Sequence, residues 1–381
     1  MSKQRIAWID GVKGLACMIV FWEHIYYTFL GNSPVIMGQI HEGVPSFFKI
    51  ANILVNGNFG VCLFVMLSGY LASVKQINSI GELGKAVLLR YLKFIAAFAA
   101  VFVLYQVILG TIGFQTQIWG QEYESAWVAM HYSNKLTWLE CIREVFLFGF
   151  GMNAPLWTIM PIFLSNVLVF VINYLTRNKL QRMKVVIAIA FVVAGFVFGY
   201  PGYGVWSQII LYTGYSFVGM LLPYLWKFFS KWKEWILWIL LICAVIGVNG
   251  GYRYVVSYAS MVVRVPEVFY SQIYWNAILA IAIVSFIGGM AGLCKGLSKP
   301  FFQIINQYSF PVYLFHFPIF CSVGLWLHRL VSLKVNQTIT FFLMAVTMHL
   351  LVFAVAWLYN ETWDKWSNKL VKKTNVNPIQ K

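Results

Sequence analysis

The chain has 381 residues, of which 60% are hydrophobic and only 10% are charged, and its mean hydropathy is +0.73. Soluble domains carry about 25% charged residues, so the composition excludes an ordinary soluble protein and predicts a polytopic membrane protein. The net charge of +16 does not indicate nucleic-acid binding, because the basic residues fall in short patches between apolar runs and form no basic-aromatic groove.

Ten apolar segments predict an all-α helix bundle, which we expect to form one transmembrane domain, 1–366, followed by a short basic cytoplasmic tail, 367–381. Ten crossings place both termini on one side of the membrane. That side carries 21 of the 28 lysines and arginines, which marks it as cytoplasmic. The expected spans are 8–30, 52–74, 90–112, 154–175, 185–200, 208–226, 235–249, 275–294, 303–327 and 337–360.

The first span contains ionisable residues that are rare in an apolar helix. Lys13 and His24 are eleven steps apart, about three helical turns, so their side chains share a face and His24 lies roughly 16 Å deeper. Asp10 and Glu23 occupy the same segment, although Glu23 points about 100° away from His24. Buried ionisable groups in a membrane indicate function by default. The alternative is a lone histidine that a neighbouring helix satisfies.

The second and third spans add two further patterns. Gly60, Ser68 and Gly69 are small enough to permit close approach of another helix. Arg90 and Lys93 are spaced i and i+3, so both cations point the same way at the cytoplasmic membrane edge. They are either ordinary topology signals or a phosphate clamp, since a guanidinium grips phosphate in a bidentate way.

The loops on the other side of the membrane are longer and more aromatic. The segment 136–148 is typical of an amphipathic helix at the membrane interface. The segment 250–274 holds five tyrosines, which form an interfacial belt or stack against sugar rings.

The ninth span is unusually polar. Ser309, Tyr313 and His316 are spaced i, i+4 and i+7 and so lie on one helical stripe. Pro311 and Pro318 would kink this helix and free backbone carbonyls. The alternative is a kinked packing helix whose polar groups bond one another.

Together these features resemble acyltransferase family 3, integral membrane proteins that O-acylate bacterial cell-surface polysaccharides and related glycans. Two departures concern Lys13 and Lys93, which stand where arginine is commoner, and a third is the missing acidic residue after Trp157. The resembling stretches, in family order, are Trp8–Ala16 with His24 downstream, Leu63–Ala72, Leu89–Phe94, Pro155–Ile159 and Tyr308–His316.

The resemblance implies acetyl-CoA or another acyl-CoA as donor substrate, a glycan hydroxyl as acceptor, and the inner or plasma membrane of a bacterium as location. His24 is expected to be the general base on the acceptor hydroxyl, or alternatively a nucleophile that carries the acyl group. Arg90 and Lys93 would hold the CoA phosphates, and Lys13 would line the donor's path. The residues expected to orient the acceptor or stabilise the oxyanion are Ser309, Tyr313, His316, Glu23 and Trp157.

A transporter or flippase for a glycan or lipid-linked substrate is the alternative from another class, since polar groups on kinked helices also suit transport. An inverted repeat would favour it, and the two halves show none. Six scattered cysteines form no CxxC pair, so we expect neither a disulfide framework nor a metal site. The expected partners are acyl-CoA, the glycan acceptor and the bilayer. A second copy of the chain and polysaccharide-assembly proteins are further candidates, and nucleic acid is not.

Overall fold

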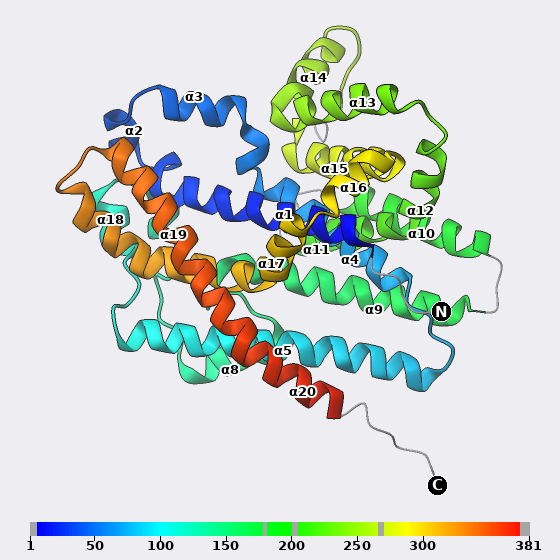
Figure 1. Cartoon of the computed structure of the whole chain (residues 1–381), viewed down its shortest axis with the longest axis horizontal. Helices are drawn as coiled ribbons and strands as arrows, with labels where there is room; N and C mark the ends of the chain where they lie inside the picture. Colours follow the sequence, from blue (N-terminus) through cyan, green and yellow to red (C-terminus); the bar gives the residue numbers. More distant parts are fainter. Residues whose placement is uncertain (1–5, 178–180, 200–204, 266–269, 374–381) are drawn as a thin grey trace. The chain divides into compact units, whose positions relative to one another are not determined.

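The computed structural model describes residues 6–177, 181–199, 205–265 and 270–373, and these residues form helices joined by turns, with no strand among them. The expected tail therefore lies outside the described residues beyond Lys373, and its first part belongs to helix α20, Lys365–Lys373. The prediction of an all-α chain is confirmed for this described part of the molecule (Figure 1).

Each of the ten expected spans coincides with a helix or a pair of helices. Six helical stretches are long and apolar enough to cross a membrane, and the bent pair α11, Val205–Ser216, and α12, Val218–Phe229, makes up to seven. The stretches are Ile80–Gly110, Ala154–Leu175, Glu234–Ser260, Gln272–Gly289, Pro300–Ser332 and Gln337–Lys369.

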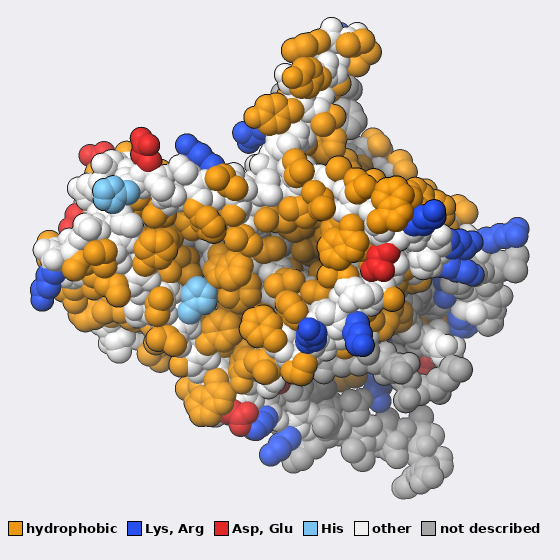
Figure 2. All heavy atoms as spheres, turned by 45° about the horizontal axis from the view of Figure 1, so that its top comes forward, with side chains coloured by type: hydrophobic (Ala, Val, Ile, Leu, Met, Phe, Trp, Pro, Cys, Tyr) orange, Lys and Arg blue, Asp and Glu red, His pale blue; other side chains and the backbone are white. Residues whose placement is uncertain are grey.

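The other three expected spans are α1, Ala7–Tyr26, α4, Gly57–Ser73, and α10, Gln181–Phe198. Helix α1 contains three charged residues, and α4 has only 17 residues. The ten-span count therefore stays a prediction for these three helices, while the multi-pass character of the chain is clear. Large hydrophobic side chains remain exposed on α5, Ile80–Gly110, α13, Glu234–Ile246, and α19, Gln337–Tyr359, as lipid-facing helices require. Figure 2 shows how widely hydrophobic side chains cover the visible face.

The chain divides into two compact units. Unit 1 comprises residues 1–20, 49–87 and 158–307, and unit 2 comprises residues 21–48, 88–157 and 308–381. Helices α1, α5, Ile80–Gly110, and α17, Pro300–Ile319, contribute residues to both units.

Unit 1 is built around α4, which packs against α9, Ile159–Leu175, α11, α12 and α15, Gln272–Gly289. The backbones approach closely because glycines lie at the crossings. A Cβ on Gly69 would lie 2.0 Å from the Ser216 carbonyl oxygen, and one on Gly219 would lie 2.3 Å from that of Met66. The predicted role of the small residues in the second span is thus confirmed.

A buried amide network lies in unit 1. Asn56 and Asn276 each donate to the other's amide oxygen at 2.9 Å, and Asn276 also donates to Asn58 at 2.9 Å. Asn58 in turn donates to the Tyr212 hydroxyl at 2.6 Å, and the Phe59 N–H donates to Asn56. Each of the three asparagine side chains therefore donates at least one hydrogen bond and accepts at least one.

Unit 2 contains the expected amphipathic helix as α8, Trp138–Leu147, which begins with a capping box between Thr137 and Glu140. Its apolar face is exposed, with Leu139 68% and Leu147 61% accessible, which agrees with the interfacial helix that the sequence predicts. At its other end Glu144 accepts hydrogen bonds from the Gly151 and Met152 N–H groups, and these bonds shape the loop that leads to Pro155.

Candidate active site

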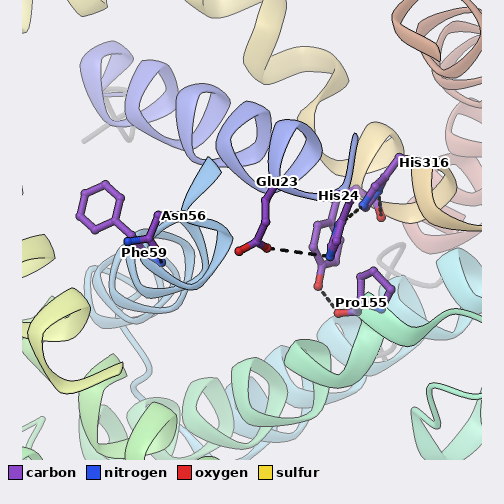
Figure 3. A network of polar contacts seen from close by, with 7 residues as sticks. Glu23, His24, Asn56, Phe59, Pro155 and His316 are labelled. Atoms are coloured by element: carbon purple, nitrogen blue, oxygen red, sulfur yellow. Dashed lines mark hydrogen bonds and ion pairs between the residues drawn. The ribbon is translucent and has the colours of Figure 1, made fainter. Parts of the chain in front are cut away.

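The polar centre of unit 2 is a pair of imidazoles that are 292 residues apart in the sequence. His24 Nδ1 lies 2.7 Å from His316 Nε2, and the two rings stack with centroids 5.0 Å apart. His24 lies in the last turn of α1, which continues into the short π-helix Tyr27–Gly31, and its side chain is 15% exposed. His316 on α17 is fully buried. Figure 3 shows the two rings side by side.

Hydrogen bonding assigns the protons of this pair. His316 Nδ1 lies 3.0 Å from the carbonyl oxygens of Val312 and Tyr313, which can only accept, so this nitrogen carries a proton. In a neutral imidazole the other nitrogen then accepts, and His24 Nδ1–H must be the donor of the 2.7 Å bond. His24 Nε2 is consequently left with its lone pair.

The orientation of His316 follows from the sequence of α17. Pro318 has no N–H, so the Leu314 carbonyl loses its helical partner, and Asn153 Nδ2 donates to it at 2.7 Å. The predicted freeing of a carbonyl by a proline is confirmed here. One residue earlier, the Tyr313 hydroxyl donates to the Pro155 carbonyl (Figure 3). Both bonds tie the loop before α9 to the helix that holds His316.

Aromatic rings surround the pair and keep it apolar. Phe317 lies 5.1 Å from the His24 ring centroid, and Phe21 and Phe320 lie 6.0 and 5.6 Å from that of His316. A hydrogen bond in such surroundings is electrostatically stronger than one in water.

Glu23 provides the acidic group nearest to the free nitrogen of His24. Its Oε2 lies 4.0 Å from His24 Nε2, and its side chain is 21% exposed (Figure 3). The contact is an ion pair only when the imidazole is protonated. A carboxylate at this distance would stabilise the imidazolium that forms when Nε2 takes up a proton.

Two residues beside His24 were not singled out by the sequence. The Trp127 indole stacks on the His24 ring at 6.4 Å and 23°, and His131 contacts both Trp127 and Phe317, with centroids 4.8 and 4.9 Å away. Burial lowers the pKa of His131, which lies between the spans, to about 4. The i and i+4 spacing of an indole and an imidazole on an extramembrane segment was the only sequence signal for them.

The predicted donor residues lie on α5. The Arg90 guanidinium stacks on Phe94 at 4.7 Å, and Lys93 is exposed one turn along the helix. Lys13 belongs to unit 1, where its Nζ lies 3.6 Å from Asp10 Oδ1. All three cations are thus placed on helices as the spacing predicts, and their contact with a donor stays a prediction.

The remaining predicted acceptor residues are Ser309 and Trp157. Ser309 is buried on α17, two turns before His316, and Trp157 is half-buried in the 3₁₀ turn Ala154–Thr158. Both belong to unit 2, which also holds His24, Glu23, Tyr313 and His316. Their proposed roles toward an acceptor remain predictions. The interhelical alternative is seen at His349, whose Nε2 accepts from Trp22 Nε1 at 2.9 Å.

Among the residues that the structure describes, no three His, Cys, Asp or Glu side chains gather as metal ligands. Comparison with protein families shows that residues 6–361 match the acyltransferase domain that defines the acyltransferase 3 family. No curated protein and no solved structure matches the chain.

Proposed function

Because the chain belongs to the acyltransferase 3 family, we propose that it moves an acyl group, specifically acetyl, from cytoplasmic acyl-CoA to a hydroxyl of a cell-surface or lipid-linked glycan. The family and the apolar helices make the chain a multi-pass membrane acyltransferase. The donor, the acceptor and the location in a bacterial inner membrane are the proposed part.

The observation that supports the chemistry best is the free Nε2 of His24. His316 accepts the Nδ1–H of His24, and the proton of His316 is donated to two backbone carbonyls. The lone pair that these bonds leave available is therefore the one on His24 Nε2. An imidazole whose ordinary pKa is near neutral is the commonest general base in enzymes.

In the direct route, His24 Nε2 takes the proton of the acceptor hydroxyl while its oxygen attacks the thioester carbonyl. The C–S bond then breaks, and the CoA thiolate leaves with the proton that the imidazolium returns. His24 Nδ1–H stays bonded to His316 throughout, and Glu23 stabilises the imidazolium.

In the covalent alternative, His24 Nε2 itself attacks the thioester carbonyl, the C–S bond breaks and CoA leaves as the thiolate, while His316 Nε2 accepts the Nδ1 proton of the acyl-imidazolium. The acceptor hydroxyl then attacks the acyl carbonyl and the bond from that carbon to Nε2 breaks. His24 regains its Nδ1 proton from His316, and the hydroxyl proton neutralises the CoA thiolate. This route suits transfer across a membrane, because the donor and the acceptor need not be bound together.

The donor would be held by cations at the cytoplasmic edge. Arg90 and Lys93 are the proposed phosphate ligands, and Lys13 lines the path of the pantetheine arm. A transporter of a lipid-linked glycan is the rival function, but an unsatisfied imidazole nitrogen beside a carboxylate is more useful for group transfer than for translocation.

The test uses the purified full-length chain in detergent or nanodiscs. Radiolabelled acetyl-CoA is the donor, and envelope glycan from the organism that makes this protein is the acceptor. We expect label in the glycan fraction and stoichiometric CoA release. The Arg90→Ala protein should bind acetyl-CoA about 10–150-fold more weakly, since a charge-assisted contact contributes about 1.5–3 kcal/mol.

The matched control is Arg177→Ala, which removes another arginine that stacks on a ring, at 4.1 Å from Tyr174, and should leave donor binding unchanged. No label in the glycan and no binding of acetyl-CoA by the wild-type protein would refute the proposed function.

A further inference from the structure

We propose that Trp127, His131 and Tyr132 form the acceptor subsite of this enzyme and that the subsite binds an uncharged pyranose ring of the glycan. The inference rests on the proposed acyl transfer at His24. All three residues lie in the extramembrane segment between α5 and α8, and none was assigned a role by the sequence.

The three side chains belong to one aromatic cluster with the His24 ring within unit 2. Trp127 stacks on His24 with centroids 6.4 Å apart, and Tyr27 borders the indole at 5.8 Å. His131 and Tyr132 both contact Phe317, at 4.9 and 6.1 Å, and Phe317 contacts His24 at 5.1 Å. A molecule bound to these residues therefore lies beside His24.

Two polar atoms of this group make no hydrogen bond within the described part of the protein. His131 Nε2 and the Tyr132 hydroxyl are buried, and neither has a hydrogen-bond partner among the described residues. A buried polar group without a partner is destabilising, so a ligand that supplies hydroxyl groups would be favoured at this position. Burial also keeps the Tyr132 phenol protonated, because it raises the pKa of that group well above its ordinary value.

Two other rings of the same outer segment have partners for their polar atoms. Tyr123 shares a 2.6 Å hydrogen bond with Ser332, and Trp119 donates to His328 at 3.0 Å. Tyr132 differs from them in its backbone as well, since its φ of 53° lies in the left-handed region. Strain of this kind in a residue without β-branching is retained where the surrounding structure holds it, and it is commonest at functional sites.

The chemistry of the group favours a neutral sugar. The face of an indole packs against the C–H face of a pyranose, and an imidazole and a phenol can each donate to or accept from its hydroxyl groups. Within the described part of the chain, no lysine or arginine stacks on these rings, and the Glu23 carboxylate beside His24 would repel a uronic acid. A sugar ring packed against Trp127 would then lie next to His24, which contacts the same indole.

The experiment separates acceptor binding from donor binding. Trp127→Ala, His131→Ala and Tyr132→Phe are expressed in cells that lack the wild-type gene, and acyl groups on the surface glycan are measured at equal protein level. We expect a loss of about tenfold or more for Trp127→Ala and His131→Ala, and a smaller loss for Tyr132→Phe, since only one hydroxyl is removed. Acetyl-CoA affinity of the purified variants should stay within about twofold of wild type.

Matched controls use the same changes elsewhere in the segment. Trp138→Ala removes a 64% exposed indole, and Tyr123→Phe removes a hydroxyl that already has a partner. Both should keep full glycan acylation. If Trp127→Ala does not fold, Trp127→Phe keeps an apolar ring and should still lower acylation.

Three results would overturn the inference while the proposed function stands. They are unchanged glycan acylation in all three variants, a parallel loss of acetyl-CoA binding, and acyl groups that nuclear magnetic resonance maps to a charged sugar of the glycan. A wild-type protein that acylates no glycan would instead refute the proposed function itself.

Discussion

Two buried polar clusters, one in each unit, differ in how completely their hydrogen bonds are satisfied. In unit 1, Asn276 bonds to both Asn56 and Asn58 at 2.9 Å, and each of the three amides both donates and accepts. In unit 2, the Glu23 carboxylate lies 4.0 Å from His24 Nε2, too far for a hydrogen bond, and His131 Nε2 has no partner among the described residues.

This contrast distinguishes polar groups that stabilise the fold of an apolar protein from polar groups that remain available to react with a substrate. A closed amide network stabilises a fold and has nothing left to offer a substrate. A pair of bonded imidazoles that leaves one ring nitrogen without a hydrogen bond lowers the stability of the fold, but that nitrogen can act as a base. Polar residues in a membrane span are therefore better judged by which of their hydrogen bonds are missing than by their presence.

The largest expected effect is that of His24→Ala. Removal of the open nitrogen should lower acyl transfer by about 10²–10⁴ or more, as loss of a general base does. Radiolabelled acetyl transfer at equal protein level measures it. His349→Gln is the control, because glutamine can still accept from Trp22. Wild-type-like transfer by a folded His24→Ala protein would show that the open nitrogen is not used.

A smaller effect is expected at His316, which positions His24. His316→Phe removes the acceptor of the His24 Nδ1–H bond, and loss of such an orienting partner typically costs about 10–100-fold. His316→Gln should recover part of the rate, since an amide oxygen can accept the same proton.

The readout that distinguishes positioning from mere packing is the ¹⁵N spectrum of His24. We expect the Nδ1–H tautomer in wild type and in His316→Gln, and a mixture of tautomers in His316→Phe. Equal spectra in all three proteins, with equal rates, would mean that the 2.7 Å contact does not set the tautomer.

The sequence predicted the helices and the individual polar residues better than their partners. A period of about 3.6 residues places Ser309, Tyr313 and His316 on one stripe, and glycine size predicts the close crossing at Gly69. Both are local properties. The bond between His24 and His316 joins residues 292 apart, and spacing within one helix contains no information about which second helix will face it.

The amide network and Trp127 were missed for a related reason. Asn56 caps α4, Asn58 lies in its first turn and Asn276 lies on α15, so the sequence does not show that the three amides meet until the helices are packed. Trp127 lies on a helix of only four residues, too short for any hydrophobic period to reveal.

The closed network of unit 1 predicts a stability effect without a catalytic one. Asn276→Ala removes the acceptor of the Asn56 amide N–H and the donor to Asn58 Oδ1, and it should cost about 1–3 kcal/mol, seen as a lower Tm in detergent. Acyl transfer per folded molecule should stay within about twofold. Asn368→Ala, which removes an exposed amide, should change stability by no more than about 0.5 kcal/mol. A loss of transfer at unchanged Tm would contradict the division between the units.

The smallest expected effect is a pH dependence of stability that comes from His131 in unit 2. Burial against the rings of Trp127 and Phe317 lowers the pKa of His131 from 6.5 to about 4 in the folded protein. The unfolded chain therefore binds a proton first as the pH falls, so His131 destabilises the fold progressively from about pH 6.5 down to about pH 4 and has no effect above pH 7.

Replacing His131 by glutamine removes this titration and keeps a polar side chain. We expect the Tm of His131→Gln to fall less than that of wild type between pH 7.5 and pH 5, with the two proteins differing little at pH 7.5. Thermal unfolding in the same detergent at both pH values measures the difference. Equal losses of Tm in the two proteins would mean that His131 is already partnered by solvent, and the contrast between an open and a closed polar cluster would then be limited to His24.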